Sequence, residues 1–189
     1  MNGIILIGGE SKRMGQPKAL LRYQGKTLAE RSIELLSNCC SIVYVSGKEE
    51  QQISFSDIPC PFIADKYPAI GPIGGIVSSF ETVDCPELGL LVMATDMPLV
   101  DLDTLIQLIV QRDKQKYATM YVHKNSGFLE PLCAIYEPTA YPELKKAIFR
   151  QEYSMQRIFE RGQLNLIEIK TPDLLKNINT PEDLENILK

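Results

Sequence analysis

Residues 3–18, with the sequence GIILIGGESKRMGQPK, decide the fold class of this chain. The run at 3–7 is short, apolar and rich in β-branched side chains, and Gly8 and Gly9 follow it directly. An apolar run that stops at a glycine pair predicts a buried strand that enters a loop. The loop matches neither the dinucleotide fingerprint G-x-G-x-x-G nor the phosphate loop G-x-x-x-x-G-K-[ST].

Glycines and basic side chains together make this loop a candidate anion site. Glycines let backbone N–H groups approach an anion closely, and Arg13 and Lys18 supply the positive charge that phosphate requires. A nucleoside triphosphate is therefore the favoured ligand. The loop alone leaves open an ordinary strand-to-helix turn, with Lys12, Arg13 and Lys18 on a solvated face.

Strand and helix patterns alternate beyond this loop. Residues 27–30 have the form of a capping box, and Asp101 or Asp103 is placed to cap a later helix. Residues 88–94 are apolar on both faces, as in a central strand of a parallel sheet. The patterns predict strands over 3–7, 41–46, 61–64, 88–94, 119–122, 129–136 and 164–169, and helices over 27–37, 72–80, 101–113, 142–150, 154–160 and from Thr180 onward.

This order predicts an α/β fold, with an open, mostly parallel sheet and helices on both faces. A length of 189 residues, 44% of them hydrophobic and 23% charged, fits a single globular domain over 1–189. No apolar run approaches the about 18–20 residues that cross a bilayer, so we expect no membrane insertion. Lys and Arg number 20 against 24 Asp and Glu, and the net charge of -4 disfavours nucleic acid as a partner.

Cysteine and histidine usage restricts the chemistry and the compartment. The five cysteines are scattered without a C-x-x-C pair, and no secretory signal pattern opens the chain, so we expect a cytoplasmic protein. His123 is the only histidine, which disfavours zinc sites of the Cys/His type and Ser-His-Asp catalysis. Any metal is expected on carboxylate oxygen.

Several loops are predicted to meet at one edge of the sheet, because ligands of open α/β folds bind outside the carboxyl ends of the strands. The loops at 8–18, 46–47 and 65–75 fall there, together with Asp96. A lone carboxylate such as Asp96 suits Mg²⁺ bound to phosphates. A turn or a helix cap is the alternative role for Asp96 and for Asp65.

The sequence resembles the molybdenum cofactor guanylyltransferase (MobA) family of nucleotidyltransferases along its whole length. The resemblance is carried by five blocks in order, of which the last, with its Asn-x-Asn-Thr-Pro pattern, is the most specific. The blocks are LIGG through RMG and KALL at 6–21, GPIGGI at 71–76, TDMP at 95–98, EPLCAIY at 130–136 and NINTPEDL at 177–184.

This resemblance implies a Rossmann-like nucleotidyltransferase fold that transfers GMP from Mg-GTP to the phosphate of molybdenum-molybdopterin and releases pyrophosphate. The N-terminal part of the domain would bind the nucleotide and the C-terminal part the pterin. Mg²⁺ is the implied cofactor. The implied roles place Leu6, Gly8 and Gly9 along the nucleotide, Arg13 and Lys18 on the triphosphate, Ser46 and Asp65 near the nucleoside, Asp96 on Mg²⁺, and Asn177 and Asn179 at the pterin phosphate.

The sequence departs from the family in two places. Pro17 stands where the family often has an acidic residue, and Ser46 stands where it often has asparagine near the end of the second strand. Gly8 favours guanine, because related cytidylyltransferases tend to have alanine there.

Three other functions stay open from the residues alone. Two are nucleotidyltransferases, one acting with cytidine on the same pterin and the other on a sugar phosphate. The third is a carrier without catalysis, which Arg13, Lys18 and Asp96 argue against. The resemblance also suggests molybdenum-cofactor biosynthesis proteins and acceptor molybdoenzymes, or their chaperones, as partners.

Overall fold

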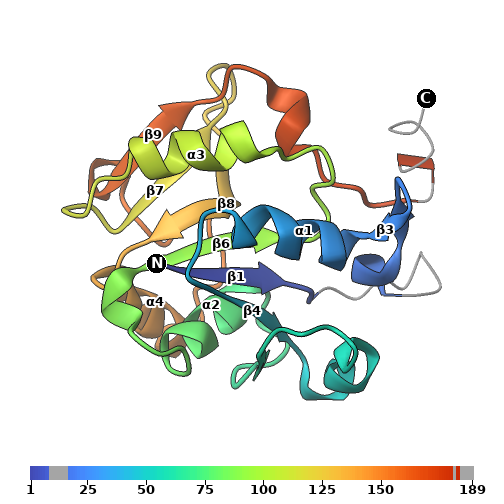
Figure 1. Cartoon of the computed structure of the whole chain (residues 1–189). Coiled ribbons are helices and arrows are strands. Elements are labelled where there is room, and N and C mark those ends of the chain that lie inside the picture. Colours follow the sequence, from blue (N-terminus) through green and yellow to red (C-terminus); the bar gives the residue numbers. More distant parts are fainter. Residues whose placement is uncertain (9–16, 181, 184–189) are drawn as a thin grey trace.

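A computed structural model describes residues 1–8, 17–180 and 182–183 of the chain. Its centre is a seven-stranded sheet with the order β5-β4-β1-β6-β8-β7-β9 (Figure 1). Within this sheet β8 alone runs against its neighbours, which confirms the predicted open, mostly parallel α/β sheet. The strands are β1 (Asn2–Leu6), β4 (Ile42–Gly47), β5 (Phe62–Ala64), β6 (Leu90–Ala94), β7 (Ala118–Val122), β8 (Leu129–Tyr136) and β9 (Leu164–Glu168).

Helices cover both faces of the sheet. Helices α1 (Leu28–Ser37) and α3 (Leu102–Val110) pack on one face, and α2 (Pro72–Phe80) and α4 (Ala140–Phe149) pack on the other (Figure 1). The two faces alternate along the first strand, where Leu6 joins one buried cluster and Ile5 joins the other. This burial on both sides is the reason that residues 3–7 are apolar without alternation.

Local sequence signals determine where α1 and α3 begin. In α1, Glu30 N–H donates to Thr27 Oγ1 at 3.1 Å, and the Glu30 carboxylate accepts from Thr27 N–H at 2.7 Å. This is the predicted capping box. Asp101 caps α3, because its carboxylate accepts from Thr104 N–H at 2.8 Å.

The predicted helix over 154–160 is wrong, and these residues form turns and bends. Met155 and Phe159 are buried in the core, so the apolar spacing was a true burial pattern. Gln156 Nε2, however, donates to the carbonyl of Leu129 at 2.7 Å, and Gln156 Oε1 accepts from Leu129 N–H at 2.9 Å. The side-chain amide thus pairs with the start of β8 as a neighbouring strand would, and this tertiary contact overrides the helical periodicity.

A small ribbon and the start of the terminal helix lie outside the main sheet. A small ribbon pairs β2 (Arg22–Tyr23) with β3 (Lys26–Thr27) just before α1, and the sequence did not predict it. Of the predicted terminal helix, Glu182 and Asp183 are helical, and the remainder lies outside the described residues. Asp183 N–H donates to Thr180 Oγ1 at 3.2 Å, as expected for a cap at Thr180.

The sheet order creates a switch point at the carboxyl end of β1. Strand β1 lies between β4 and β6, α1 follows it on one face, and α2 connects β5 to β6 on the other. The loops that leave β1 and β6 therefore open a crevice between them, where open α/β sheets bind ligands. Among the described helices, none has the length and apolar character needed to cross a membrane.

Candidate functional site

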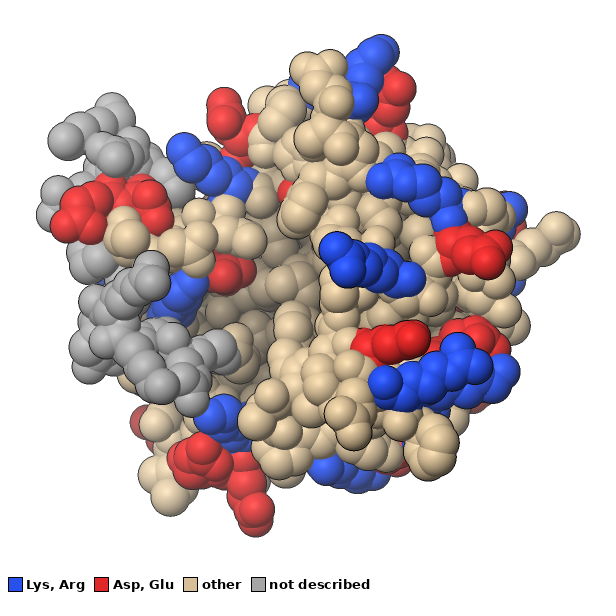
Figure 2. All heavy atoms as spheres, turned by 180° about the vertical axis from the view of Figure 1, so that it is seen from behind, with Lys and Arg blue, Asp and Glu red and all other residues tan. Residues whose placement is uncertain are grey.

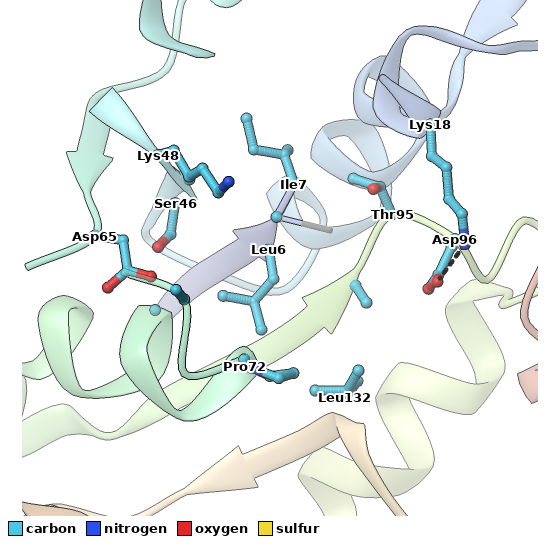
Figure 3. A pocket seen from close by; sticks show the side chains of 16 residues that line it. Leu6, Ile7, Lys18, Ser46, Lys48, Asp65, Pro72, Thr95, Asp96 and Leu132 are labelled. Atoms are coloured by element: carbon cyan, nitrogen blue, oxygen red, sulfur yellow. Dashed lines mark hydrogen bonds and ion pairs between the residues drawn. The ribbon is translucent and has the colours of Figure 1, made fainter. Parts of the chain in front are cut away.

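A pocket of about 570 Å³ lies at the carboxyl ends of β1, β4, β5 and β6. Figure 2 shows a hollow left of centre on the face opposite to that of Figure 1, with basic and acidic atoms at its edge. The close view in Figure 3 places Ser46, Lys48 and Asp65 at one end of the pocket and Lys18 and Asp96 at the other. Six of the residues predicted for the site line this one pocket, namely Leu6, Gly8, Lys18, Ser46, Asp65 and Asp96.

The charged end of the pocket joins three distant parts of the chain. Lys18 begins a 3₁₀ turn, and its Nζ lies 3.5 Å from Asp96 Oδ2 and donates to Asn179 Oδ1 at 2.9 Å. The main chain closes the same corner, since Ile178 N–H donates to the carbonyl of Asp96 at 2.8 Å. Three of the predicted site residues therefore meet at one point. Asn177 is exposed beside them and does not line the pocket.

Asp96 is the residue that fits a metal ion. Burial raises the pKa of its carboxyl above the ordinary 3.8, although the nearby Lys18 ammonium acts to lower it. Within the described part of the chain, Asp96 Oδ1 is buried and has no hydrogen-bond partner. A buried carboxylate oxygen without a partner is costly, and a hard cation would satisfy it.

The donor set around Asp96 suits Mg²⁺ on a phosphate substrate. The described residues include no group of three or more His, Cys, Asp or Glu side chains that could hold a metal by themselves. Mg²⁺ is commonly bound by one or two carboxylates, with waters and substrate phosphates as its other ligands. A single carboxylate beside a lysine, at the edge of an open pocket, matches this mode of binding.

Close packing around Gly75 shapes the opposite end of the pocket. Ser46 is buried, and its hydroxyl has no hydrogen-bond partner among the described residues. A Cβ added at Gly75 of α2 would lie 2.9 Å from Leu6 Cδ2 and 3.2 Å from Ser46 Oγ. Gly75 therefore keeps open the space where Leu6 and Ser46 face a ligand.

Asp65 lines the same end but is already engaged with the protein. Its Oδ1 accepts from Tyr67 N–H at 2.8 Å and from Ser78 Oγ at 3.2 Å. These bonds fix the loop after β5 onto α2. The structure thus supports both interpretations of Asp65, because it closes a turn and also lines the pocket.

Gly8 also lines the pocket, at the point where the first loop leaves β1. A Cβ added there would meet no atom of the described chain within 4 Å, so its glycine is not required by packing. Two predicted residues, Gly9 and Arg13, lie outside the described residues.

Sequence reasoning missed several residues that line the pocket. Lys48 follows the second parallel strand, Thr95 precedes Asp96, and Leu132 belongs to β8. The position of Lys48 just past a predicted strand end was a usable signal. Leu132 had none, because its strand reaches the pocket from the opposite direction.

Comparison with known proteins gives a consistent result. The family described as the MobA-like NTP transferase domain matches residues 3–166. A probable molybdenum cofactor guanylyltransferase from Thermococcus sibiricus is 33% identical over 199 residues, which cover 99% of this chain and 97% of the relative. A molybdenum cofactor biosynthesis bifunctional protein from Synechocystis is 30% identical over 98% of this chain, which spans 53% of that relative's length.

A solved structure has the same fold. It is the molybdopterin-guanine dinucleotide biosynthesis protein A from Archaeoglobus fulgidus, with a TM-score of 0.81 and 28% sequence identity. The match covers 98% of this chain and 96% of that one, so the agreement extends over the sheet and the segments that form the pocket.

Proposed function

The chain belongs to the family of MobA-like NTP transferase domains, and from this premise we propose that it transfers GMP from GTP to the terminal phosphate of molybdenum-bound molybdopterin. The products are pyrophosphate and the guanine dinucleotide form of the cofactor. The observation that carries the proposal is the charged end of the pocket, where Asp96 Oδ1 is buried without a partner beside the Lys18 ammonium.

The transfer requires no protein nucleophile. An oxygen of the acceptor phosphate attacks the α-phosphorus of GTP in line, the bond from this phosphorus to the bridging oxygen breaks, and pyrophosphate leaves with the electron pair. The protein contributes position and charge neutralisation. Mg²⁺ bound at Asp96 supplies further neutralisation of phosphate charge.

The residues of the pocket divide this work between them. Lys18 holds the phosphates, and Asn179 orients its ammonium through the 2.9 Å hydrogen bond. Arg13 also holds the triphosphate. Leu6, Gly8 and Gly9 lie along the nucleotide, Ser46 and Asp65 approach the nucleoside, and Asn177 and Asn179 frame the acceptor phosphate.

This division makes the N-terminal part of the single domain the nucleotide-binding part and the C-terminal part the pterin-binding part. We place the protein in the cytoplasm, where the unpaired state of its five described cysteines is stable. Molybdenum-cofactor biosynthesis proteins and acceptor molybdoenzymes, or their chaperones, are the protein partners proposed for it.

Two measurements on the same samples test the proposal. Thermal unfolding with Mg²⁺ and each of GTP, CTP, ATP and UTP reports binding, because a ligand of the native state raises its stability. Pyrophosphate release with molybdenum-bound molybdopterin as acceptor reports transfer. We expect both responses with GTP, their loss in Asp96→Asn, and no change in the control Asp57→Asn, whose carboxylate is exposed outside the pocket.

Each alternative predicts a different result. A preference for CTP would identify a cytidylyltransferase, and pyrophosphate release with a sugar phosphate in place of the pterin would identify a sugar-nucleotide enzyme. Stabilisation by GTP without pyrophosphate release in the presence of molybdopterin would identify a carrier.

A further inference from the structure

A second polar cluster lies at the same edge of the sheet but does not line the pocket. His123 Nε2 and Glu130 Oε1 are 2.6 Å apart, and their side chains are 26% and 11% exposed. Phe128 packs edge-on against the His123 ring, with ring centroids 6.2 Å apart, and is 51% exposed. These three residues, called the hairpin cluster below, belong to the β7–β8 turn and the start of β8.

The hairpin cluster lies beyond Asp96, on the side away from the nucleoside end of the pocket. In the sheet, β8 and β7 lie on one side of β6, while β4 and β5 lie on the other. Pairing with β6 stops at Cys133, so the first residues of β8 extend past the end of β6 and pair Glu130 with Tyr121. Leu132 connects the two regions, because it lies two positions after Glu130 on β8 and lines the pocket, where it lies beside Pro72 (Figure 3).

The carboxylates of Glu130 and Asp96 lie near enough to interact electrostatically. Burial raises the pKa of Glu130, the hydrogen bond with His123 acts to lower it, and the charge of Asp96 raises it further. The two carboxylates are therefore within electrostatic reach of one another. A ligand whose phosphate meets Lys18 and Asp96 can extend in this direction toward Glu130.

The turn is held by main-chain hydrogen bonds, including the one from His123 N–H to the Phe128 carbonyl at 2.9 Å, and by side chains outside the hairpin cluster. Gln156 makes both hydrogen bonds to the main chain of Leu129, Arg161 donates to the carbonyl of Gly127, and Lys124 pairs with Glu168 at 3.2 Å. In the free protein the buried Glu130 carboxylate carries a desolvation cost, and the exposed Phe128 ring against His123 adds apolar surface. Such a pair is typical of a site that binds a flat, polar ring.

We infer that the hairpin cluster binds the pterin ring of the acceptor, with the Glu130 carboxylate accepting hydrogen bonds from its 2-amino group and N3–H, and with Phe128 against its face. This inference rests on the proposed function and assigns the ring-recognition residues of its acceptor side. His123 positions the carboxylate. A carboxylate has about four acceptor positions, so the bond with His123 leaves room for two donors from one ring edge.

Guanine presents the same pair of N–H donors as the pterin. The location of Glu130 relative to the nucleoside end of the pocket determines which of the two rings can reach it. The nucleoside end of the pocket is formed by Ser46, Lys48 and Asp65, at the far end from Asp96 (Figure 3). A guanine bound there is separated from Glu130 by the whole triphosphate region. The acceptor ring is therefore the one that reaches the hairpin cluster.

The test uses two fluorescent probes that differ at one substituent of the ring. The first is 6-hydroxymethylpterin phosphate, and the second is its 2-oxo analogue, a lumazine. Their affinities are measured by fluorescence titration with Mg²⁺ and α,β-methylene-GTP present, so that no transfer occurs. The variants are Glu130→Gln and Phe128→Leu, and Glu152→Gln is the matched control, because Glu152 is an exposed carboxylate outside both the pocket and the hairpin cluster.

We expect the wild type and Glu152→Gln to prefer the pterin by at least about tenfold, since the 2-oxo group turns a donor into an acceptor against Glu130. Glu130→Gln removes or inverts this preference, because the amide can donate to the 2-oxo group. Phe128→Leu weakens both probes by about fivefold without changing their ratio.

An unchanged preference in folded Glu130→Gln would overturn the inference, as would equal binding of both probes by the wild type. If Glu130→Gln does not fold, unchanged affinities in Phe128→Leu overturn it instead. Thermal stabilisation by Mg²⁺ and GTP, measured in the wild type and the same variants, distinguishes failure of the proposed function from failure of this inference. If GTP does not stabilise the wild type, the proposed function is contradicted. If GTP stabilises it but the pterin is not preferred, only the assignment of the hairpin cluster is contradicted.

Discussion

At the residue scale, Asp96 combines a functional advantage with a cost to stability. Its carboxylate lies just past the end of β6 and is mostly buried, and its buried Oδ1 has no partner among the described residues. We expect Asp96→Asn, without Mg²⁺ and nucleotide at pH 7, to be as stable as the wild type or more stable by up to about 1 kcal/mol. Chemical unfolding measures this difference, and a large loss of stability in the variant would contradict it.

The pKa of Asp96 also determines how the difference in unfolding free energy between the wild type and Asp96→Asn changes with pH. Burial raises the pKa of Asp96 above 3.8, so the folded protein holds this proton more tightly than the unfolded chain does. The wild type therefore loses stability relative to Asp96→Asn as the pH rises from about 3.8 through the raised value in the folded state. Unfolding curves of both proteins across this range check the direction, and the opposite trend would show that Lys18 dominates over burial.

A substitution at Gly8 is expected to affect nucleotide binding but not the stability of the fold. Because a Cβ at this position meets no described atom within 4 Å, Gly8→Ala is expected to change the free energy of unfolding by less than about 0.5 kcal/mol. The methyl group instead occupies space at the pocket, so we expect the KM for GTP to rise by about tenfold. The control is Gly162→Ala, a glycine with equally open surroundings outside the pocket, for which steady-state kinetics should show no change.

At the scale of elements, Glu81 joins α2 to α4 and to the loop after β5. Its carboxylate accepts from Tyr67 Oη and Tyr141 Oη at 3.0 Å each and lies 2.8 Å from Lys145 Nζ. Burial alone would raise its pKa, but the Lys145, Tyr141 and Tyr67 contacts outweigh burial and hold the pKa at about 2. Glu81 thereby stabilises the loop that carries Asp65.

A lowered carboxyl pKa stabilises the fold above the unfolded value and loses that effect in acid. The contribution of Glu81 is complete above about pH 4.5 and disappears as the pH falls toward about 2. We expect Glu81→Gln to cost about 2 kcal/mol at pH 7 and little at pH 2. Urea unfolding at both values measures this, and an equal loss at both would mean that packing, not charge, stabilises the three contacts.

At the scale of the whole molecule, the two sides of the sheet edge should respond to different ligands. We expect hydrogen exchange with Mg²⁺ and GTP to slow in the loops at 17–20, 46–48, 65–71 and 95–96, because these line the pocket. Addition of 6-hydroxymethylpterin phosphate should then slow exchange at 123–130. Protection of 123–130 by the nucleotide alone would contradict the proposal that the nucleotide and the pterin bind at different parts of this sheet edge.

The sequence by itself determined most of the local elements. The capping box at Thr27, the proline after Gly71 and the fully apolar runs of β1 and β6 are local signals, and each predicted its element closely. The sequence also located the pocket, because strand ends can be read from apolar runs and parallel strands bring their ends together.

Only the tertiary structure decided which side chains meet. Lys18 and Asn179 are 161 positions apart, and the Gln156 amide replaces a predicted helix by pairing with Leu129. The His123–Glu130 pair depends on β8 running past the end of β6. The physical reason is the same in each case, since periodicity and caps are set by neighbours in the chain, while hydrogen bonds between distant side chains depend on the order and direction of strands.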